Sequence, residues 1–562
     1  MMKKHNPLEA LPSLIKDYLR SLKVDNRFLS GVSLEIPPKE EYGDLSTSIA
    51  LKLSKVLRRP PAEIAESLAG YINERIKDTG LQEDVASVRI AGGGFVNFCL
   101  TENFFRKVLK EIVSLGGDFG RSRLGRGHKI LVEFVSANPT GPLSIAHARQ
   151  AAVGDALCNI LAFLGFSVKR EYYLNDEGNQ INLLGESIQA RLKELLGEPF
   201  EFPEGGYEGE YIGQIAREIL QKKPVLRLRS GLALSEAEAP ESFSEYGVRY
   251  ILRIIKQELK DFGIEFDYWY SQKQLVKSGK IGKVVSLLKS KGVAYEKDGA
   301  LWFKSTAFGD DKDRVIIKSD GSYTYLTPDI GYHRDKFRRG FSRLINLWGP
   351  DHHGYISRIK AAIQALGRSP DSLSVIIVQL ATVFREGKPL PMSTRRGQYI
   401  TLREVLDEVG SDAARFFFLM RRTSAHLDFD LELAKKQTPE NPVYYVQYAH
   451  ARICSIIRKA PFKPQLSRAK LELLKEPEEL KVIRKLWQFS DILQTCYKNI
   501  DPYFITAYLQ EVAEVLHRFY ERHRVLNEDE SLTQARLVLI SAARTVIRNG
   551  LGLLGISAPE SM

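Results

Sequence analysis

One stretch of this sequence constrains the fold more than any other, because it has the pattern of a βαβ unit. Residues 129–135 form an apolar run that is typical of a buried parallel strand. A loop containing Pro and Gly follows, and residues 144–164 then place apolar side chains at helical spacing. Gly165 is suited to end this helix, and residues 167–174 form the next expected strand. This order predicts a Rossmann-type, doubly wound parallel sheet that binds ligands outside the carboxyl ends of its strands.

The chain is expected to be multidomain, combining α/β parts with an all-α part. Its 562 residues exceed the ~250–300 at which a single hydrophobic core stops growing. Residues 1–120 predict a small N-terminal α/β domain that ends at a link rich in Gly and Arg. The parallel-sheet core is expected over 121–400, with an insertion near 185–265. Residues 401–562 show helical periodicity, which predicts a helical bundle without parallel strands.

The composition is that of a water-soluble chain with a basic balance. The formal net charge of +12 favours a polyanionic partner such as nucleic acid, although many basic proteins bind none. The four cysteines lie far apart, without CxxC spacing, which indicates buried free thiols rather than a zinc site or disulfides. There is no signal peptide pattern and no uninterrupted apolar run of ~18 residues. We therefore expect a cytoplasmic protein with no metal site and no membrane span.

The loop from Glu133 to His147, EFVSANPTGPLSIAH, has features of a phosphate-binding loop. Its small residues let backbone approach a ligand closely, and the helix behind it offers free N–H groups and a positive dipole end. His147, in the first helical turn, could donate a hydrogen bond to charge developing on a phosphate. Taken alone, the loop also fits an ordinary crossover with a surface histidine.

A second segment, GPDHHG at 349–354, follows the apolar strand expected to end at Trp348. Adjacent histidines beside an aspartate fit either a metal site or nucleotide contacts. Since no other cluster of His or Cys is available to complete a metal site, we favour nucleotide contacts.

A third segment, MSTRRG at 392–397, places two arginines on a loop flanked by glycine. Paired guanidinium groups can clamp phosphate, and the alternative is a solvated basic turn.

A fourth segment, YTYLTPD at 323–329, ends in Asp329. An aspartate at the end of an aromatic-rich strand could face a cationic substrate. The alternative is a helix N-terminal cap, because Asp often has that role after Pro.

Together these segments resemble bacterial arginyl-tRNA synthetases over nearly the whole chain. NPTGPLSIAHARQAAVGDAL and REYYLNDEGNQIN, within 132–188, resemble the family's signature region, and WGPDHHGY and PMSTRRG follow at the family's positions. DEVGSDAARFFFLMR, NPVYYVQYAHAR, FYERHRVL and RNGLGLLGISAPESM resemble its anticodon-binding bundle. EYGDLSTSIALKLSK resembles the extra N-terminal domain of these enzymes. The combination is specific to the family, although no single piece is.

The resemblance implies a class I arginine–tRNA ligase. Such an enzyme uses ATP, with Mg²⁺, to activate arginine as an adenylate and then transfers it to the 3′ end of tRNA(Arg). The helical domain reads the anticodon, the N-terminal domain contacts the tRNA, and the protein is expected to be a monomer. Family members also need bound tRNA before they activate arginine, and we expect the same here by analogy.

The resemblance also implies residue roles. Catalytic roles fall on Ser144, His147, Arg395 and Arg396. The implied ATP contacts are Pro139, Thr140, Gly141, Ser144, His147, Gly349, Asp351, His352, His353, Met392 and Ser393. The implied arginine contacts are Glu133, Asn138, Gln272, Tyr325 and Asp329.

The two ATP motifs of the class depart from the family pattern here. The motif named HIGH reads Ser-Ile-Ala-His at 144–147, so its second histidine is present, its first histidine is replaced by serine and its glycine by alanine. The motif named KMSKS reads Pro-Met-Ser-Thr-Arg at 391–395 and lacks both lysines, so Arg395 or Arg396 is expected to contact the phosphates instead. An acidic position of the arginine pocket is occupied by Gln272. These changes leave a catalytically impaired tRNA-binding relative as the main alternative, and an unrelated Rossmann nucleotidyltransferase as a second.

Overall fold

The computed structural model describes residues 7–222, 242–390 and 399–562. They form two compact units. The first unit contains Met1–Phe119, Ile456–Gln488 and Glu514–Val546. The second contains Gly120–Ser455, Phe489–Ala513 and Ile547–Met562. No helix in the described part of the chain is both long enough and apolar enough to cross a bilayer.

The N-terminal part of the first unit is a small antiparallel sheet with helices. The strands are in the order β1-β3-β2. The sheet and its helices are β1 (Leu45–Thr47), β2 (Val85–Ala91), β3 (Phe95–Leu100), α1 (Pro7–Ser21), α2 (Asn26–Ser30), α3 (Ile49–Leu57), α4 (Pro61–Thr79) and α5 (Glu102–Leu115). Strands β2 and β3 pair in antiparallel on either side of three consecutive glycines, Gly92, Gly93 and Gly94. Ser46 pairs with Asn97 in the sheet, and α3 begins three residues later at Ile49.

The C-terminal part of the chain is helical, as its periodicity predicts. Helices α17, α20 and α21 each contribute residues to both compact units. The helices are α17 (Pro442–Lys459), α18 (Pro477–Trp487), α19 (Phe489–Asn499), α20 (Tyr503–Arg522) and α21 (Glu530–Leu553). In the first unit, Trp487 of α18 makes edge-to-face contacts with Phe104 and Phe105 of α5, so apolar packing joins these helices.

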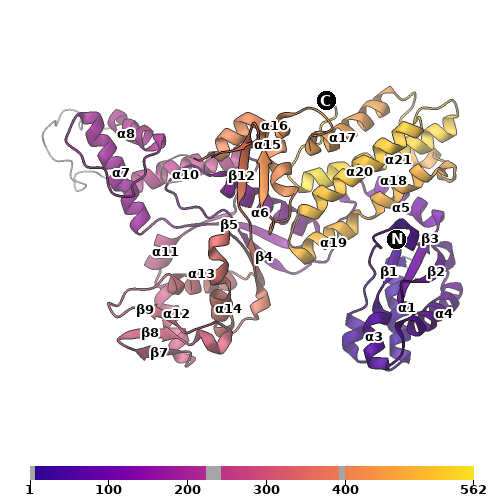
Figure 1. Cartoon of the computed structure of the whole chain (residues 1–562), viewed down its shortest axis with the longest axis horizontal. Coiled ribbons are helices and arrows are strands. Elements are labelled where there is room, and N and C mark those ends of the chain that lie inside the picture. The colour runs from indigo at the N-terminus through magenta and orange to yellow at the C-terminus, as the bar shows by residue number, and fades with distance from the viewer. Residues whose placement is uncertain (1–6, 223–241, 391–398) are drawn as a thin grey trace. The chain divides into compact units, whose positions relative to one another are not determined.

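The centre of the second unit is a five-stranded, wholly parallel sheet (Figure 1). In the order β11-β10-β4-β5-β6, the strands β5 and β6 lie on one side of β4. The later strands β10 and β11 lie on the other side of β4. The strands are β4 (Lys129–Glu133), β5 (Ser167–Leu174), β6 (Tyr268–Ser271), β10 (Arg343–Trp348) and β11 (Leu373–Ile377). The predicted doubly wound Rossmann-type core is confirmed, and its switch point lies between β4 and β10.

Helices cover both faces of this sheet. Helix α6 (Ile145–Phe163) packs on one face, and α13 (Leu326–Arg338) and α14 (Ile356–Ala365) pack on the other (Figure 1). Gly154 of α6 lies so close to Phe134 that an added Cβ would come within 2.3 Å of the ring. Glycine is therefore needed there for the helix to approach the end of β4.

The second unit also holds two smaller sheets and several further helices. The order β7-β8-β9 is antiparallel and the order β13-β12-β14 is mixed. The strands are β7 (Ala294–Lys297), β8 (Ala300–Phe303), β9 (Arg314–Ile317), β12 (Ala381–Arg385), β13 (Lys388–Pro389) and β14 (Leu427–Asp430). The helices are α7 (Asn179–Leu196), α8 (Glu210–Lys222), α10 (Phe243–Asp261), α11 (Gln272–Lys277), α12 (Lys280–Ser290), α15 (Leu402–Leu419) and α16 (Leu431–Lys435).

Strand β14 contradicts one expectation from the sequence. We expected no parallel strand after residue 401, yet β14 pairs in parallel with β12. Its four residues alternate between buried and less buried positions, so the strand is stabilised by packing as well as by its pairing with β12.

Candidate active site

The carboxyl ends of β4 and β10 open into a cavity of about 460 Å³. Glu133 and Asn346 are direct neighbours in the register of these two strands. The lining includes Glu133, Val135, Ser136, Asn138, His147, Gln150, Tyr173, Asn175, Asp329, His333, Asn346, Trp348, Gly349, Asp351, His352 and Tyr355. The cavity therefore lies at the switch point, where a doubly wound sheet binds its ligand.

The chain turns sharply as it leaves β4. Val135 and Ser136 have φ angles of 67° and 41°, a conformation that non-glycine residues rarely adopt. Ser136 Oγ accepts a hydrogen bond from the Tyr173 N–H at 3.1 Å and donates to Glu133 Oε1 at 3.3 Å. Tyr172 also donates its hydroxyl hydrogen to the Ala137 carbonyl at 2.9 Å. These bonds to β5 stabilise the turn and point Glu133 into the cavity.

Glu133 has a buried cationic partner. Lys336 of α13 is fully buried and donates to Glu133 Oε2. Its ammonium group also donates to Asn346 Oδ1 at 3.3 Å and lies 4.1 Å from the centroid of the Tyr332 ring. The two strands and the helix are thus joined beneath the cavity by one charge-assisted network.

Asp329 lies in the first turn of α13 and faces the same cavity. Tyr355 donates its hydroxyl hydrogen to Asp329 Oδ2 at 2.6 Å. Burial, helped by the negative charge of Glu133, raises the pKa of Asp329 to about 6. The site therefore holds a carboxylate that is costly to ionise when no cation is present.

The sequence predicted a strand end at Asp329, and the structure differs. Tyr323 forms an isolated bridge to Ile317, and helix α13 begins at Leu326. Within the helix, the His333 ring donates from Nδ1 to the Asp329 carbonyl at 2.8 Å. Its Nε2 accepts from Asn346 Nδ2 at 3.0 Å, which connects α13 to the end of β10.

His147 is held in one protonation state by the start of α6. The Ser144 N–H donates to His147 Nδ1 at 3.2 Å, so Nδ1 accepts and the remaining ring hydrogen lies on Nε2. Ser144 Oγ lies 3.1 Å from the same nitrogen. Burial lowers the pKa of His147 to about 4. The imidazole is therefore neutral near pH 7 and offers one N–H donor.

A second cavity, of about 410 Å³, adjoins the first along residues 137–147. His147 and Asn138 line both cavities, and Thr140, Gly141 and Ser144 line the second. Tyr211 donates to the Thr140 carbonyl at 2.7 Å, and Tyr399 donates to the Pro142 carbonyl at 3.0 Å. These tyrosines fix the backbone of the loop that the sequence predicted to bind phosphate.

The segment after β10 is a 3₁₀ helix over Pro350–Tyr355. Gly349, Asp351 and His352 line the first cavity, and all three side chains of Asp351, His352 and His353 are exposed. His352 Nε2 lies 3.4 Å from Asp351 Oδ2. This segment forms the solvent-facing edge of the site.

Two of the residues that resemblance assigned to arginine lie outside the cavity lining. Tyr325 is 86% exposed. Gln272 accepts from the Tyr173 hydroxyl at 2.9 Å and donates to Glu177 at 3.2 Å, so it reaches the cavity only through Tyr173. Asn138 lines the cavity and donates to Gln180 at 2.6 Å. Met392, Ser393, Arg395 and Arg396 lie outside the described residues.

Three residues of the site were not predicted from the sequence: Lys336, Asn346 and Tyr355. Asp329, His333 and Lys336 follow the i, i+4, i+7 spacing of one helical face, and this signal was available. Tyr355 ends the segment WGPDHHGY, so its position beside the motif was a further signal. Asn346 lies inside an apolar strand, where a polar side chain needs a hydrogen-bond partner.

A buried carboxyl group stabilises the loop from the side of α10. Glu258 is 4% exposed and accepts from the Leu143 N–H at 3.3 Å. Burial raises its pKa to about 7. Since the folded-state pKa lies above the unfolded value, stability is greatest below about pH 4.5 for this group and is lost as pH rises through 7.

We expect Glu258→Gln to remove this pH dependence, because glutamine keeps the acceptor for Leu143 but cannot ionise. At pH 8 the variant should be more stable than wild type by up to about 3 kcal/mol, and at pH 5 by less than about 1 kcal/mol. Thermal unfolding at both pH values measures the difference. Glu265→Gln, at an exposed position, is the control. An equal midpoint shift at pH 5 and pH 8 would contradict the assignment.

The fold and the site define the class. The parallel sheet, the switch-point cavity and the loop at the start of α6 are those of a class I aminoacyl-tRNA synthetase. Residues 109–425 match the family model described as tRNA synthetases class I (R), catalytic domain. Residues 9–100 match the arginyl tRNA synthetase N terminal domain, and 446–562 match the DALR anticodon binding domain. The chain belongs to the arginyl-tRNA synthetase family.

Individual members of the family are similar to this chain over nearly its full length. The chain is 47% identical to the arginine–tRNA ligase of Geobacter sp. strain M21 over 562 residues, covering 99% of this chain and 100% of the relative. It is 46% identical to that of Geobacillus kaustophilus, covering 95% of each chain. The solved Thermus thermophilus arginyl-tRNA synthetase is 23% identical, with a TM-score of 0.75 over 99% of this chain and 100% of that one, and shares the fold.

Proposed function

We infer that this chain is an arginine–tRNA ligase and that its switch-point cavity is where arginine is activated. The carboxylate of arginine attacks the α-phosphate of ATP, which forms arginyl-adenylate and releases diphosphate. A terminal hydroxyl of tRNA then attacks the acyl carbon, which forms arginyl-tRNA and releases AMP. The observation that carries the function is the full-length identity of 47% to an arginine–tRNA ligase.

Arginine recognition is assigned to Asp329, with Glu133 and Asn138 beside it. A guanidinium group is a planar cation that pairs well with carboxylate. Glu133 already has Lys336 and Ser136 as partners, whereas among the residues that the structure describes Asp329 Oδ2 accepts from the Tyr355 hydroxyl alone. Asp329 is therefore proposed as the principal partner of the guanidinium, and Glu133 and Asn138 as groups that orient the substrate.

The ATP phosphates are assigned to the loop 139–144 and the start of α6. Neutral His147 is proposed to donate from Nε2 to the phosphate oxygen on which charge develops. Ser144 is proposed to position His147, since its N–H holds Nδ1. Mg²⁺ usually enters with ATP and takes only one or two carboxylates from a protein. Asp351, exposed at the edge of the cavity, fits that limited role.

The roles of the other parts follow from the family. We propose that residues 1–120 contact the tRNA, that 121–400 catalyse with an insertion near 185–265, and that 401–562 read the anticodon. The protein is proposed to be cytoplasmic, because tRNA and ATP are its substrates, and to be a monomer, as the resemblance implies. Sedimentation of the purified chain tests the monomer, and a larger species would exclude it.

Charging of tRNA(Arg) by the purified protein, with ATP and Mg²⁺, tests the function. We expect incorporation of arginine and none of lysine, because the shorter ammonium side chain cannot form the planar contact with Asp329. Binding of tRNA by a folded protein without charging would instead favour the catalytically impaired relative.

A separate experiment tests which cations replace the missing lysines of the second ATP motif. Arg395 and Arg396 are proposed to supply the cation, and replacing both with alanine should slow adenylate formation by about a hundredfold, or ~3 kcal/mol. Lys388→Ala, just before this segment, is the control. An unchanged rate in the double variant would exclude the proposal.

The pKa of Asp329 predicts how arginine binding depends on pH. The carboxyl group must ionise to pair with a guanidinium, and its pKa is about 6. The apparent arginine affinity should therefore fall about tenfold for each pH unit below 6 and be constant above 7. Arginine titrations between pH 5 and 8 measure this profile, and it should be flat in Asp329→Asn.

A further inference from the structure

The exposed face of α10 carries a row of cations that the site described above does not use. They follow one another at steps of four, three and four residues, so they share one side of the helix. We call them the α10 stripe: Arg249, Arg253, Lys256 and Lys260. The opposite face buries Ile251, Ile255 and Leu259, which anchors the helix. Glu258, the acidic residue between Arg249 and Lys260, is buried on the opposite face, so the exposed side of this span carries positive charge up to Asp261.

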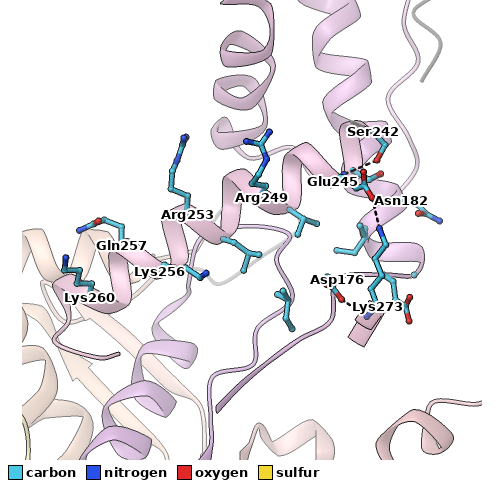
Figure 2. A pocket seen from close by; sticks show the side chains of 17 residues that line it. Asp176, Asn182, Ser242, Glu245, Arg249, Arg253, Lys256, Gln257, Lys260 and Lys273 are labelled. Carbon is cyan, nitrogen blue, oxygen red and sulfur yellow. Dashed lines mark hydrogen bonds and ion pairs between the residues drawn. The ribbon is translucent and has the colours of Figure 1, made fainter. Parts of the chain in front are cut away.

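The stripe lines a concave surface. It borders a cavity of about 810 Å³ that also includes the apolar side chains of Val248 and Leu252. Figure 2 shows the stripe spaced along α10, with Asp176, Glu245 and Lys273 grouped near the start of the helix. Lys273 pairs with Glu245 at 2.6 Å, which neutralises part of that group. A concave surface lined by cations concentrates positive potential more than an open helix face does.

The cations of the α10 stripe differ in the partners that they already have. Arg253 pairs with Glu218 at 3.0 Å. Lys256 lies 4.7 Å from the centroid of the Trp269 ring. In the described ranges of the chain, neither Lys256 nor Lys260 has a carboxylate within ion-pair distance. These two lysines are therefore available to an anionic ligand.

The cavity is next to the active site. Asn175 lines the cavity that contains Asp329, and Asp176 and Glu177, the next residues after it, line the cavity of the stripe. On the buried side of α10, Glu258 accepts from Leu143 in the loop before α6. A ligand on the stripe would thus lie beside the catalytic cavity and on a helix that contacts the loop assigned to ATP.

The length of the stripe identifies the kind of ligand. The eleven helical steps from Arg249 to Lys260 extend roughly 16 Å, which is longer than one phosphate group and suits a row of them. We propose that the α10 stripe binds the phosphate backbone of the tRNA as it enters the active site, with Lys256 and Lys260 as the principal contacts. The proposal rests on the function inferred above, because that function supplies the polyanion.

The test is the salt dependence of tRNA binding. Labelled tRNA(Arg) is titrated with wild type, with Lys256→Ala/Lys260→Ala, and with Lys283→Ala/Lys289→Ala on the exposed side of α12. The control pair removes the same charge outside the cavity. The Lys256/Lys260 variant should raise the Kd roughly 10- to 30-fold at 0.15 M KCl and reduce the slope of log K against log salt by about two. The control should match wild type.

Two results would overturn the proposal. One is a Kd and a salt slope equal to those of wild type in the Lys256/Lys260 variant. The other is an equal loss in the control pair, which would indicate an effect of net charge alone. Charging by wild type is measured alongside. If wild type binds and charges tRNA(Arg) while the Lys256/Lys260 variant is unaffected, the stripe proposal fails and the function stands, whereas absence of charging by wild type removes the function itself.

Discussion

Replacing Asp329 with asparagine should lower kcat/KM for arginine by roughly a hundredfold or more. Removing one partner of a desolvated, hydrogen-bonded charge pair typically costs 2–5 kcal/mol, and ~3 kcal/mol corresponds to about two orders of magnitude. Asparagine can still accept from the Tyr355 hydroxyl, so the local structure is expected to persist. ATP–diphosphate exchange with saturating tRNA, measured over a range of arginine concentrations, gives the value.

The loss should appear in KM for arginine and not in KM for ATP.

The thermal stability of the variant distinguishes an effect on arginine binding from an effect of unfolding. The raised pKa of Asp329 means that its ionisation opposes folding as pH rises through 6, so Asp329→Asn should unfold at pH 8 no earlier than wild type. Tyr355→Phe is the matched control, because it keeps the carboxylate and removes its hydrogen-bond donor. Arginine kinetics unchanged by Asp329→Asn would exclude the assignment.

The parallel core was predictable because its signals are local. Residues 129–135 and 167–174 are strand-length runs on either side of a helix with clear periodicity, and loops with Pro and Gly separate them. A strand followed by a helix and another strand has few possible arrangements, since crossovers are right-handed. The parallel neighbours β4 and β5 follow from that pattern, whereas the position of β10 on the other side of β4 comes from the structure.

Strand β14 was missed for the opposite reason. Its four residues, LDFD at 427–430, are too few to show a period, and they lie in a region where helical spacing dominates. The partner strand β12 lies some forty residues earlier, and it also pairs with β13. Propensity is a weak guide where pairing and burial decide the structure.

The site was predictable in part. The loop to His147 and the segment after Trp348 were found from the sequence, and the structure brings them to one cavity. The role of Lys336 was not foreseen, because HRDKFRR at 333–339 is so rich in charge that it suggests a solvated face. Burial of one lysine in such a run depends on Glu133, which lies about two hundred residues earlier. An ion pair between residues so far apart in the sequence produces no local sequence pattern that would predict it.

His147→Ala should reduce the rate of adenylate formation by about 10²–10³, because loss of one donor to a developing negative charge typically costs ~3–4 kcal/mol. The effect should fall on kcat more than on KM for ATP, since the donor is most strongly engaged in the transition state. Single-turnover measurements with arginine, ATP and tRNA give the rate.

The tautomer of His147 makes the prediction more specific. Because the Ser144 N–H holds Nδ1, only Nε2 can donate, and glutamine places an N–H near that atom. His147→Gln should therefore retain more activity than His147→Ala. Ser144→Ala keeps the backbone donor and should cost less than tenfold. With the pKa of His147 about 4, the wild-type rate should show no histidine ionisation between pH 6 and 8. A requirement for protonated His147 in that range would mean that the ring acts as a cation and that its neutral form is not the reactive one.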